Sequence, residues 1–287
     1  MFASVISIIN CMDSYAQQEN SEEKFREADI YLENKKYDKA LALYTEVIRA
    51  EPTNEVAFNK RGQVFSEKGA FDKAIEDFTK AIELNPNYSL AYFNRGWSRN
   101  RGSIHLKRGD VDGAISDYTK DVELNPNDDV GYSFRGQLYQ LKGDWDKALA
   151  DFTKAIALNP SNDRAYADRG YLYILERNHL NQEDNEKAIE DFSMSIKLNP
   201  NGSEAYYGRG WSRYQKNDFD GSIADYTKWI QIAPNDEKAY RNRAKARQKK
   251  NDFLNAVLDN IIAKCIRFWR FLRQPDRYAF NDVLRRI

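Results

Sequence analysis

The chain has 287 residues, with 44 lysines and arginines and 44 aspartates and glutamates, so its formal net charge is zero. A balanced chain lacks the basic excess that general nucleic-acid binders need, so no nucleic acid is expected as a partner. The two cysteines, Cys11 and Cys265, lie at opposite ends and imply no disulfide framework. No apolar run reaches the length of about 18 residues that a membrane-spanning helix needs.

Residues 1–20 are expected to be a leader or a disordered tail. Phe2–Ile9 is apolar and Ser14–Ala16 follows with small residues, which is typical of the end of a secretory signal peptide. The basic residues that normally precede such a segment are missing. A truncated signal peptide would make the protein secreted or periplasmic, and otherwise we expect it in the cytoplasm.

Six prolines recur along the rest of the chain at spacings of 34, 40, 34, 40 and 34 residues: Pro52, Pro86, Pro126, Pro160, Pro200 and Pro234. A period near 34 predicts tandem helical repeats. The two longer intervals indicate six extra residues in the third and fifth repeats, near residues 100–105 and 178–184. Both insertions fall between two helices, where they either lengthen the first helix or form a protruding loop. Asn178–Asp184 is rich in asparagine and acids and predicts a loop.

The second repeat, Glu55 to Tyr88, shows how one unit is built. Its apolar residues recur at spacings of three and four, which predicts two amphipathic helices. Lys68-Gly69 supplies the turn between them, because glycine adopts positive φ at a helix end. Asn85-Pro86 ends the second helix.

The same residue types return at fixed positions of each repeat. Position 8 carries glycine, at Gly62, Gly96, Gly136, Gly170 and Gly210. Position 20 carries alanine, at Ala40, Ala74, Ala114, Ala148, Ala188 and Ala256. Position 24 carries an aromatic residue, at Tyr44, Phe78, Tyr118, Phe152, Phe192 and Tyr226. Four residues depart from the pattern, Arg99 and Arg213 at the aromatic position 11 and Asp121 and Trp229 at the small position 27.

This pattern resembles the tetratricopeptide repeat (TPR) family over residues 21–263, as six repeats and a degenerate seventh. The resemblance implies an all-α, right-handed solenoid of tandem helix-turn-helix repeats, a TPR superhelix with a C-terminal capping helix. Short side chains at positions 8, 20 and 27 fit this fold because they let two helices approach closely.

Arginine at position 7 and aspartate at position 23 occur together in six repeats. The arginines are Arg61, Arg95, Arg135, Arg169, Arg209 and Arg243, and the aspartates are Asp77, Asp117, Asp151, Asp191, Asp225 and Asp259. In the first repeat both change, to Glu27 and Leu43. This co-occurrence predicts an ion pair between the two helices of each repeat, with a structural role.

No catalytic constellation stands out in the chain. The two histidines, His105 and His179, fall inside the two insertions with no cysteines beside them, whereas a metal site needs several ligands at short spacing. We therefore expect no enzyme activity, no metal and no cofactor.

The first helices of stacked repeats line a concave groove, and the family resemblance implies that ligands bind there. Six aromatic residues at groove positions are the candidate binding residues: Phe93, Trp97, Tyr171, Tyr207, Trp211 and Tyr214. Aromatic side chains with polar tips are frequent anchors of peptide interfaces. The alternative is that they pack against the next repeat.

Residues 264–287 lose the repeat pattern and carry seven basic against two acidic residues, together with Ile266, Phe268 and Trp269. A solenoid needs a cap over its last apolar face, so we expect a basic C-terminal cap. The alternative is a basic amphipathic segment that meets an anionic membrane surface.

The sequence thus predicts a non-catalytic scaffold or adaptor that binds a peptide or protein segment in its concave groove. The alternative is a membrane-peripheral assembly factor, attached through the C-terminal segment or an N-terminal export signal. The sequence does not indicate an oligomeric state.

Overall fold

The computed structural model describes residues 19–106, 110–175 and 182–272, and every regular element in these ranges is an α-helix. The expected leader, residues 1–18, lies outside the described residues. The first helical residues are 19–33, so the helix begins two residues before the predicted start of the array. The fold is the predicted series of tandem helix-turn-helix repeats.

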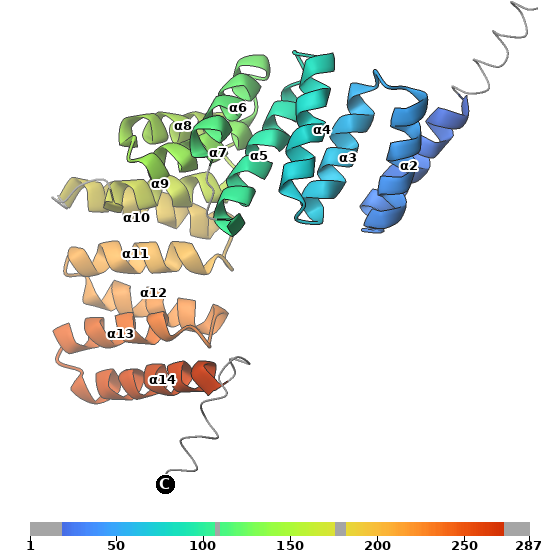
Figure 1. Cartoon of the computed structure of the whole chain (residues 1–287). Coiled ribbons are helices and arrows are strands. Elements are labelled where there is room, and N and C mark those ends of the chain that lie inside the picture. Colours follow the sequence, from blue (N-terminus) through green and yellow to red (C-terminus); the bar gives the residue numbers. More distant parts are fainter. Residues whose placement is uncertain (1–18, 107–109, 176–181, 273–287) are drawn as a thin grey trace, which may run out of the picture. The chain divides into compact units, whose positions relative to one another are not determined.

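The helices group into two compact units, residues 1–142 and 143–287 (Figure 1). The first unit holds α2 (Tyr37–Ala50), α3 (Glu55–Glu67), α4 (Phe71–Leu84), α5 (Ser89–Leu106), α6 (Val111–Leu124) and α7 (Asp129–Lys142). The second unit holds α8 (Trp145–Leu158), α9 (Asp163–Leu175), α10 (Gln182–Leu198), α11 (Ser203–Gln215), α12 (Phe219–Ile232), α13 (Glu237–Lys249) and α14 (Phe253–Leu272).

The boundaries of α3 and α4 follow from the residues that flank them. The Asn54 side chain accepts a hydrogen bond from the backbone N–H of Ala57 at 2.9 Å and so caps α3. Gly69 has a φ of 74°, which a residue without a side chain adopts at no steric cost. α4 ends at Leu84, directly before Asn85-Pro86, as predicted.

Small residues let neighbouring helices touch, both within one repeat and between consecutive repeats. A Cβ atom added at Gly62 would lie 2.7 Å from the Phe78 ring, and one added at Gly208 would lie 2.3 Å from the Phe192 ring. Ala74 and Phe78 are fully buried between the helices. At these contacts a large aromatic ring packs directly against the backbone of a glycine on the neighbouring helix.

The predicted Arg–Asp pairs are confirmed in the five cases whose two members lie within one unit. Arg61 donates from Nε and Nη2 to the two carboxylate oxygens of Asp77, both at 2.8 Å. The same fork joins Arg169 to Asp191, again at 2.8 Å. The remaining pairs are Arg95 with Asp117, Arg209 with Asp225, and Arg243 with Asp259.

The arginine at position 7 also contacts the preceding repeat, in all six repeats that have it. Its Nη1 donates to a hydroxyl at position 25 of that repeat, over 3.1–3.3 Å, in the pairs Arg61–Thr45, Arg95–Thr79, Arg135–Thr119, Arg169–Thr153, Arg209–Ser193 and Arg243–Thr227. One guanidinium therefore joins three helices. The sequence carries this feature as a threonine or serine at position 25 of the first six repeats, a regularity that was not used in the predictions.

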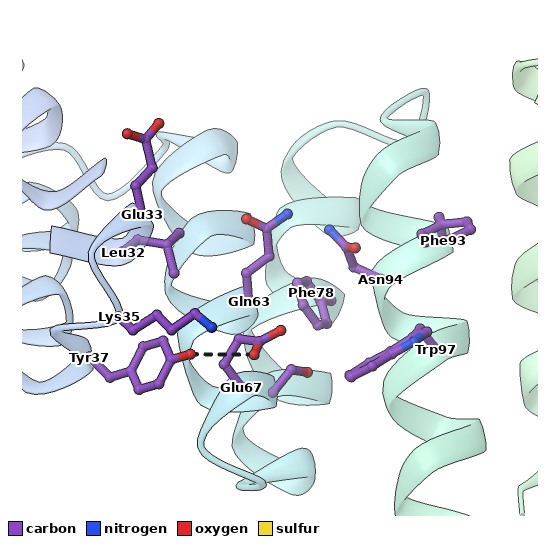
Figure 2. A pocket seen from close by; sticks show the side chains of 11 residues that line it. Leu32, Glu33, Lys35, Tyr37, Gln63, Glu67, Phe78, Phe93, Asn94 and Trp97 are labelled. Atoms are coloured by element: carbon purple, nitrogen blue, oxygen red, sulfur yellow. Dashed lines mark hydrogen bonds between the residues drawn. The ribbon is translucent and has the colours of Figure 1, made fainter. Parts of the chain in front are cut away.

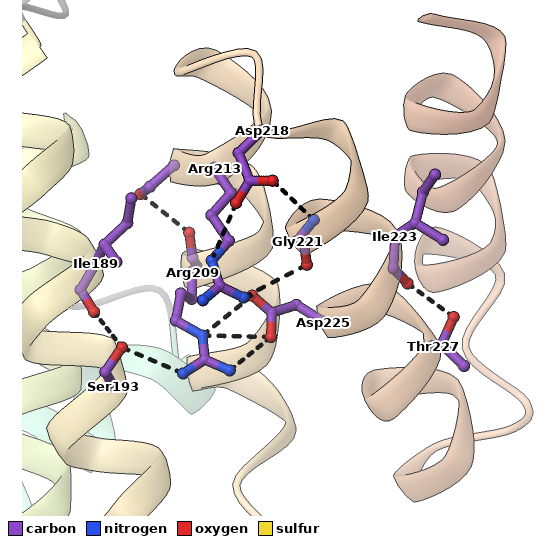
Figure 3. Close-up of polar contacts among 11 residues, drawn as sticks. Ile189, Ser193, Arg209, Arg213, Asp218, Gly221, Ile223, Asp225 and Thr227 are labelled. Atoms are coloured by element: carbon purple, nitrogen blue, oxygen red, sulfur yellow. Dashed lines mark hydrogen bonds and ion pairs between the residues drawn. The ribbon is translucent and has the colours of Figure 1, made fainter. Parts of the chain in front are cut away.

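The arginines that replace an aromatic residue at position 11 join the same network. Arg213 donates from Nη1 to the second oxygen of Asp225 at 2.8 Å, beside Arg209 (Figure 3). Arg99 does the same to Asp117 at 2.9 Å. Gly221 stands in α12 where a Cβ would come within 2.9 Å of Arg213 Cδ. The departures at position 11 are thus filled by a second ion pair instead of a ring.

The insertions differ between the two repeats. α5 runs unbroken from Ser89 to Leu106, so the residues near 100–105 lengthen the first helix. The loop expected over 178–184 is wrong for its last three residues, because α10 begins at Gln182. Residues 182–184 form the first turn of α10 although their composition favours a loop. The other residues of that predicted loop lie outside the described part.

The C-terminal boundary expected at residue 264 falls within a helix. α14 continues from Phe253 through Leu272, so the second helix of the seventh repeat and the start of the predicted cap are one element. Residues 273–287 lie outside the described part.

Candidate functional site

The first unit contains a cavity of about 450 Å³ between three consecutive repeats. Figure 2 shows its walls: Trp97, Phe93 and Asn94 from α5, Gln63 and Glu67 from α3, and the Leu32–Tyr37 stretch. Phe78 of α4 also lines the cavity. The α3 and α5 residues come from first helices of the repeats, which are the helices expected to line the groove.

Trp97 and Phe93 are held in place by their neighbours. The Trp97 ring lies edge-on to Phe71, with centroids 6.4 Å apart, and its face meets the Arg101 guanidinium at 4.9 Å. Phe93 packs edge-on against Tyr118 at 5.5 Å. Both side chains are only partly buried, so they combine a fixed orientation with an accessible surface on the cavity.

Polar groups line the opposite wall of the cavity. Glu33, Lys35 and Glu67 are exposed there, and the Tyr37 hydroxyl donates to Glu67 over 3.4 Å. Burial, and then the negative charge of Glu67, raise the pKa of Tyr37, so the hydroxyl keeps its proton. The Asn94 side-chain amide donates to Asn59 Oδ1 at 3.0 Å, which orients it on α5. The cavity therefore offers aromatic surface on one side and hydrogen-bonding groups on the other.

The other four predicted groove residues lie in the second unit. The Tyr171 hydroxyl donates to the backbone carbonyl of Glu204 at 2.7 Å, and its ring lies edge-on to Phe192 at 5.0 Å. Burial raises the pKa of Tyr171 well above its usual range. Tyr207 packs on Trp229 at 5.0 Å, and Tyr214 packs on Phe219 at 5.5 Å. Their rings therefore contribute to packing between neighbouring helices.

All six predicted residues are partly buried, and Phe93 and Trp97 border the described cavity. Contact of any of the six with a ligand remains a prediction. Leu32, Tyr37 and Asn94 also line the cavity and were not among the predicted residues. They lie at the end of one first helix, at the start of α2 and on α5, and a list of groove positions alone does not bring these together.

The described residues hold no group of three or more histidine, cysteine, aspartate or glutamate side chains that could bind a metal ion. His105 and His179 fall outside the side chains that the structure describes. In the same part of the chain, no helix combines the length and the apolar character needed to cross a bilayer.

Comparisons with known proteins agree with this geometry. Models of the tetratricopeptide repeat match residues 24–54, 56–88, 130–162 and 177–237. No curated protein matched the chain.

Three solved structures illustrate the likeness. A tetratricopeptide repeat protein from Parabacteroides merdae is 19% identical with a TM-score of 0.61, over 86% of this chain and 93% of that one. MamA is 25% identical with a TM-score of 0.53, over 59% of this chain and 95% of that one. YrrB, described as having an unusual peptide-binding site, is 22% identical with a TM-score of 0.54, over 71% of this chain and 95% of that one.

Proposed function

Because the chain belongs to the tetratricopeptide repeat family, we propose that it is a non-catalytic scaffold that binds a peptide segment of a partner protein in the cavity of its first unit. Proteins of this family generally act through protein interactions, which supports the general class. The description of YrrB as a peptide-binding protein supports a peptide as ligand.

The cavity beside Trp97 is the observation that carries the proposal. Its volume of about 450 Å³ suits one or two side chains, and concave sites with aromatic walls and a few polar groups are typical ligand sites. A bound aliphatic or aromatic side chain would rest on Trp97 and Phe93. The amides of Gln63 and Asn94 would then face the peptide backbone, which always carries donors and acceptors.

Selection from a random peptide library displayed on phage tests the proposal with the full chain. The affinity of an enriched peptide is then measured by fluorescence anisotropy for the wild type, for Trp97→Ala and for Trp269→Ala. Trp269 is a matched control because it is 61% exposed on α14 of the second unit and does not line the cavity. We expect Trp97→Ala to weaken binding at least about tenfold, as a central aromatic anchor does, and Trp269→Ala to leave it unchanged.

Circular dichroism of each variant separates loss of binding from loss of the fold. A library without enriched peptides, or equal affinity for Trp97→Ala and the wild type, contradicts the proposal. A loss in Trp211→Ala without a loss in Trp97→Ala contradicts the assignment to the first unit.

A further inference from the structure

The last helix of the described chain exposes an apolar face. Six side chains on one side of α14 form what we call the outer strip, with exposed fractions between 48% and 74%: Leu254, Val257, Leu258, Ile261, Phe268 and Trp269. Spacings of three and four place them along one face for about 22 Å. The opposite face holds α14 against α13 through Ala256, Asp259 and Ala263, each less than 5% exposed.

Two residues of the outer strip, Leu254 and Ile261, occupy positions that are polar in the six preceding repeats. Where α14 has Leu254, the six preceding repeats have an acid: Asp38, Asp72, Asp112, Asp146, Glu186 and Asp220. Where α14 has Ile261, they have the hydroxyl residue that receives the next arginine. Leu254 and Ile261 are therefore particular to this helix, whereas Val257 follows the repeat pattern.

Both replaced positions serve a following repeat elsewhere in the array. Asp38 binds Lys68 at 2.5 Å and Asp112 binds Lys142 at 2.5 Å, in each case from the next repeat. Asp220 binds Lys250 in the same way. Thr227 accepts from Arg243 at 3.1 Å. α14 offers neither contact, so its face is not made for another repeat of the same kind.

Positive charge predominates in the last two described helices. Residues 237–272, which cover α13 and α14, hold ten lysines and arginines against three aspartates and glutamates, a net charge of +7 in a chain whose total is zero. Lys264, Arg267 and Arg270 lie on α14 itself. A second copy of the same face would bring like charges together, whereas an anionic surface complements them.

A cavity of about 600 Å³ continues the apolar surface at one edge. It is lined by Ile261, Ile262, Cys265, Ile266 and Trp269, with Asn235 and Arg270. Arg270 donates from Nη2 to the backbone carbonyl of Asn235 at 3.2 Å, which holds a cation at the border of an apolar hollow. That combination fits a lipid, in which an anionic headgroup is joined to apolar chains.

We propose that the outer strip of α14 lies on an anionic lipid membrane, parallel to the bilayer surface. The apolar side chains enter the boundary between headgroups and acyl chains. Lys264, which is exposed and lies three residues after Ile261 and four before Phe268, contacts the headgroups, and the net positive charge of α13 and α14 adds a longer-range attraction. A helix with one apolar face that includes tryptophan, and with basic residues around it, is the arrangement that binds membrane surfaces in this way.

Co-sedimentation of the full chain with vesicles tests this surface. Two compositions are used, phosphatidylcholine alone and phosphatidylcholine with phosphatidylglycerol. The double variant Leu258→Gln/Ile261→Gln removes apolar surface from the outer strip. Its matched control, Ile30→Gln/Leu141→Gln, changes two apolar residues that are 56% and 69% exposed in the first unit.

We expect the wild type and the control to bind the anionic vesicles, more weakly at high salt. The outer-strip variant should bind at least about tenfold less, since it replaces two of the six apolar side chains that enter the bilayer boundary with polar amides. Equal binding by the two variants, or no binding of the wild type to anionic vesicles, overturns the proposal. A dimer seen by light scattering that only the outer-strip variant loses, without vesicle binding, assigns the face to a second copy and also overturns it.

Discussion

Asp225 is a single carboxylate that satisfies two guanidinium groups. Arg209 and Arg213 reach it from consecutive turns of α11, and its side chain is only 3% exposed (Figure 3). Removing one partner of a buried pair leaves the other charge without an acceptor, which costs more than the pair itself contributes. A solvent-exposed pair lacks this penalty.

Asp225→Ala should therefore lower the free energy of unfolding by about 3–5 kcal/mol. Asp220→Ala, which removes an exposed acid of the same helix, should lower it by less than about 1 kcal/mol. Urea denaturation followed by circular dichroism measures both. Equal losses in the two variants would show that burial does not set the importance of the pair.

Asp121 is a buried acid at a position where most repeats have a small residue. A Cβ atom added at Gly131 of the next repeat would lie 2.5 Å from Asp121 Oδ2. The absence of a side chain at Gly131 therefore leaves space for the Asp121 carboxyl group. Burial, and then the charge of Asp128, raise the pKa of Asp121 to about 8. The folded state therefore favours the neutral acid.

The stability that the protein gains from holding Asp121 in its neutral form is fully present below the unfolded-state pKa of about 4. It is lost as the pH rises to about 8. Between these values the wild type should lose at most about 1.4 kcal/mol per pH unit relative to Asp121→Asn, and the difference should be constant above pH 8. Thermal unfolding of both proteins from pH 5 to pH 9 measures it. Parallel pH profiles of the two proteins would contradict the prediction.

At the level of the helices, spacing alone predicted most of what the structure contains. Short residues such as Gly62 were expected to let two helices approach closely, and the structure shows that a Cβ at Gly62 would meet the Phe78 ring. The sequence left open whether the insertion near 100–105 lengthens a helix, because insertions outside a periodic pattern are compatible with helix and with loop. For the same reason the loop predicted from the composition of Asn178–Asp184 was wrong at its last three residues, which belong to α10. The Leu32–Tyr37 wall of the cavity was missed because it combines residues from a helix end and the next helix start.

Replacing glycine by alanine should change stability in opposite directions at positions where a Cβ would clash and at helix positions where it would fit. Gly208→Ala should destabilise the protein by about 1–3 kcal/mol, because its Cβ would meet the Phe192 ring at 2.3 Å. Gly102→Ala in α5 meets Phe71 at an ordinary 3.4 Å and should stabilise by up to about 1 kcal/mol through helix propensity. The midpoints of thermal unfolding report both signs. A stabilising Gly208→Ala would contradict the tight contact.

Across the molecule, contacts follow chain order. Within each unit the helices touch mainly their immediate neighbours, for example α3 with α4, α4 with α5, α11 with α12 and α12 with α13. In such an array stability is close to a sum of local terms, and disturbance fades with distance along the chain.

Hydrogen exchange of Asp225→Ala tests this locality. We expect faster exchange in α11, α12 and α13, which share the lost ion pairs or border them, and unchanged exchange in α3 and α4. Mass spectrometry of peptides from these helices gives the comparison. Uniformly faster exchange in all helices would show one cooperative folding unit instead.

The arginine that joins three helices also determines where the array can grow. A copy of residues 203–236 inserted after residue 236 would give every new arginine a hydroxyl in the repeat before it, since Thr227 supplies one each time. A copy appended after α14 would place its arginine opposite Ile261, which accepts no hydrogen bond. Duplication within the array therefore keeps this hydrogen bond in every repeat, whereas a repeat added after α14 would lack it.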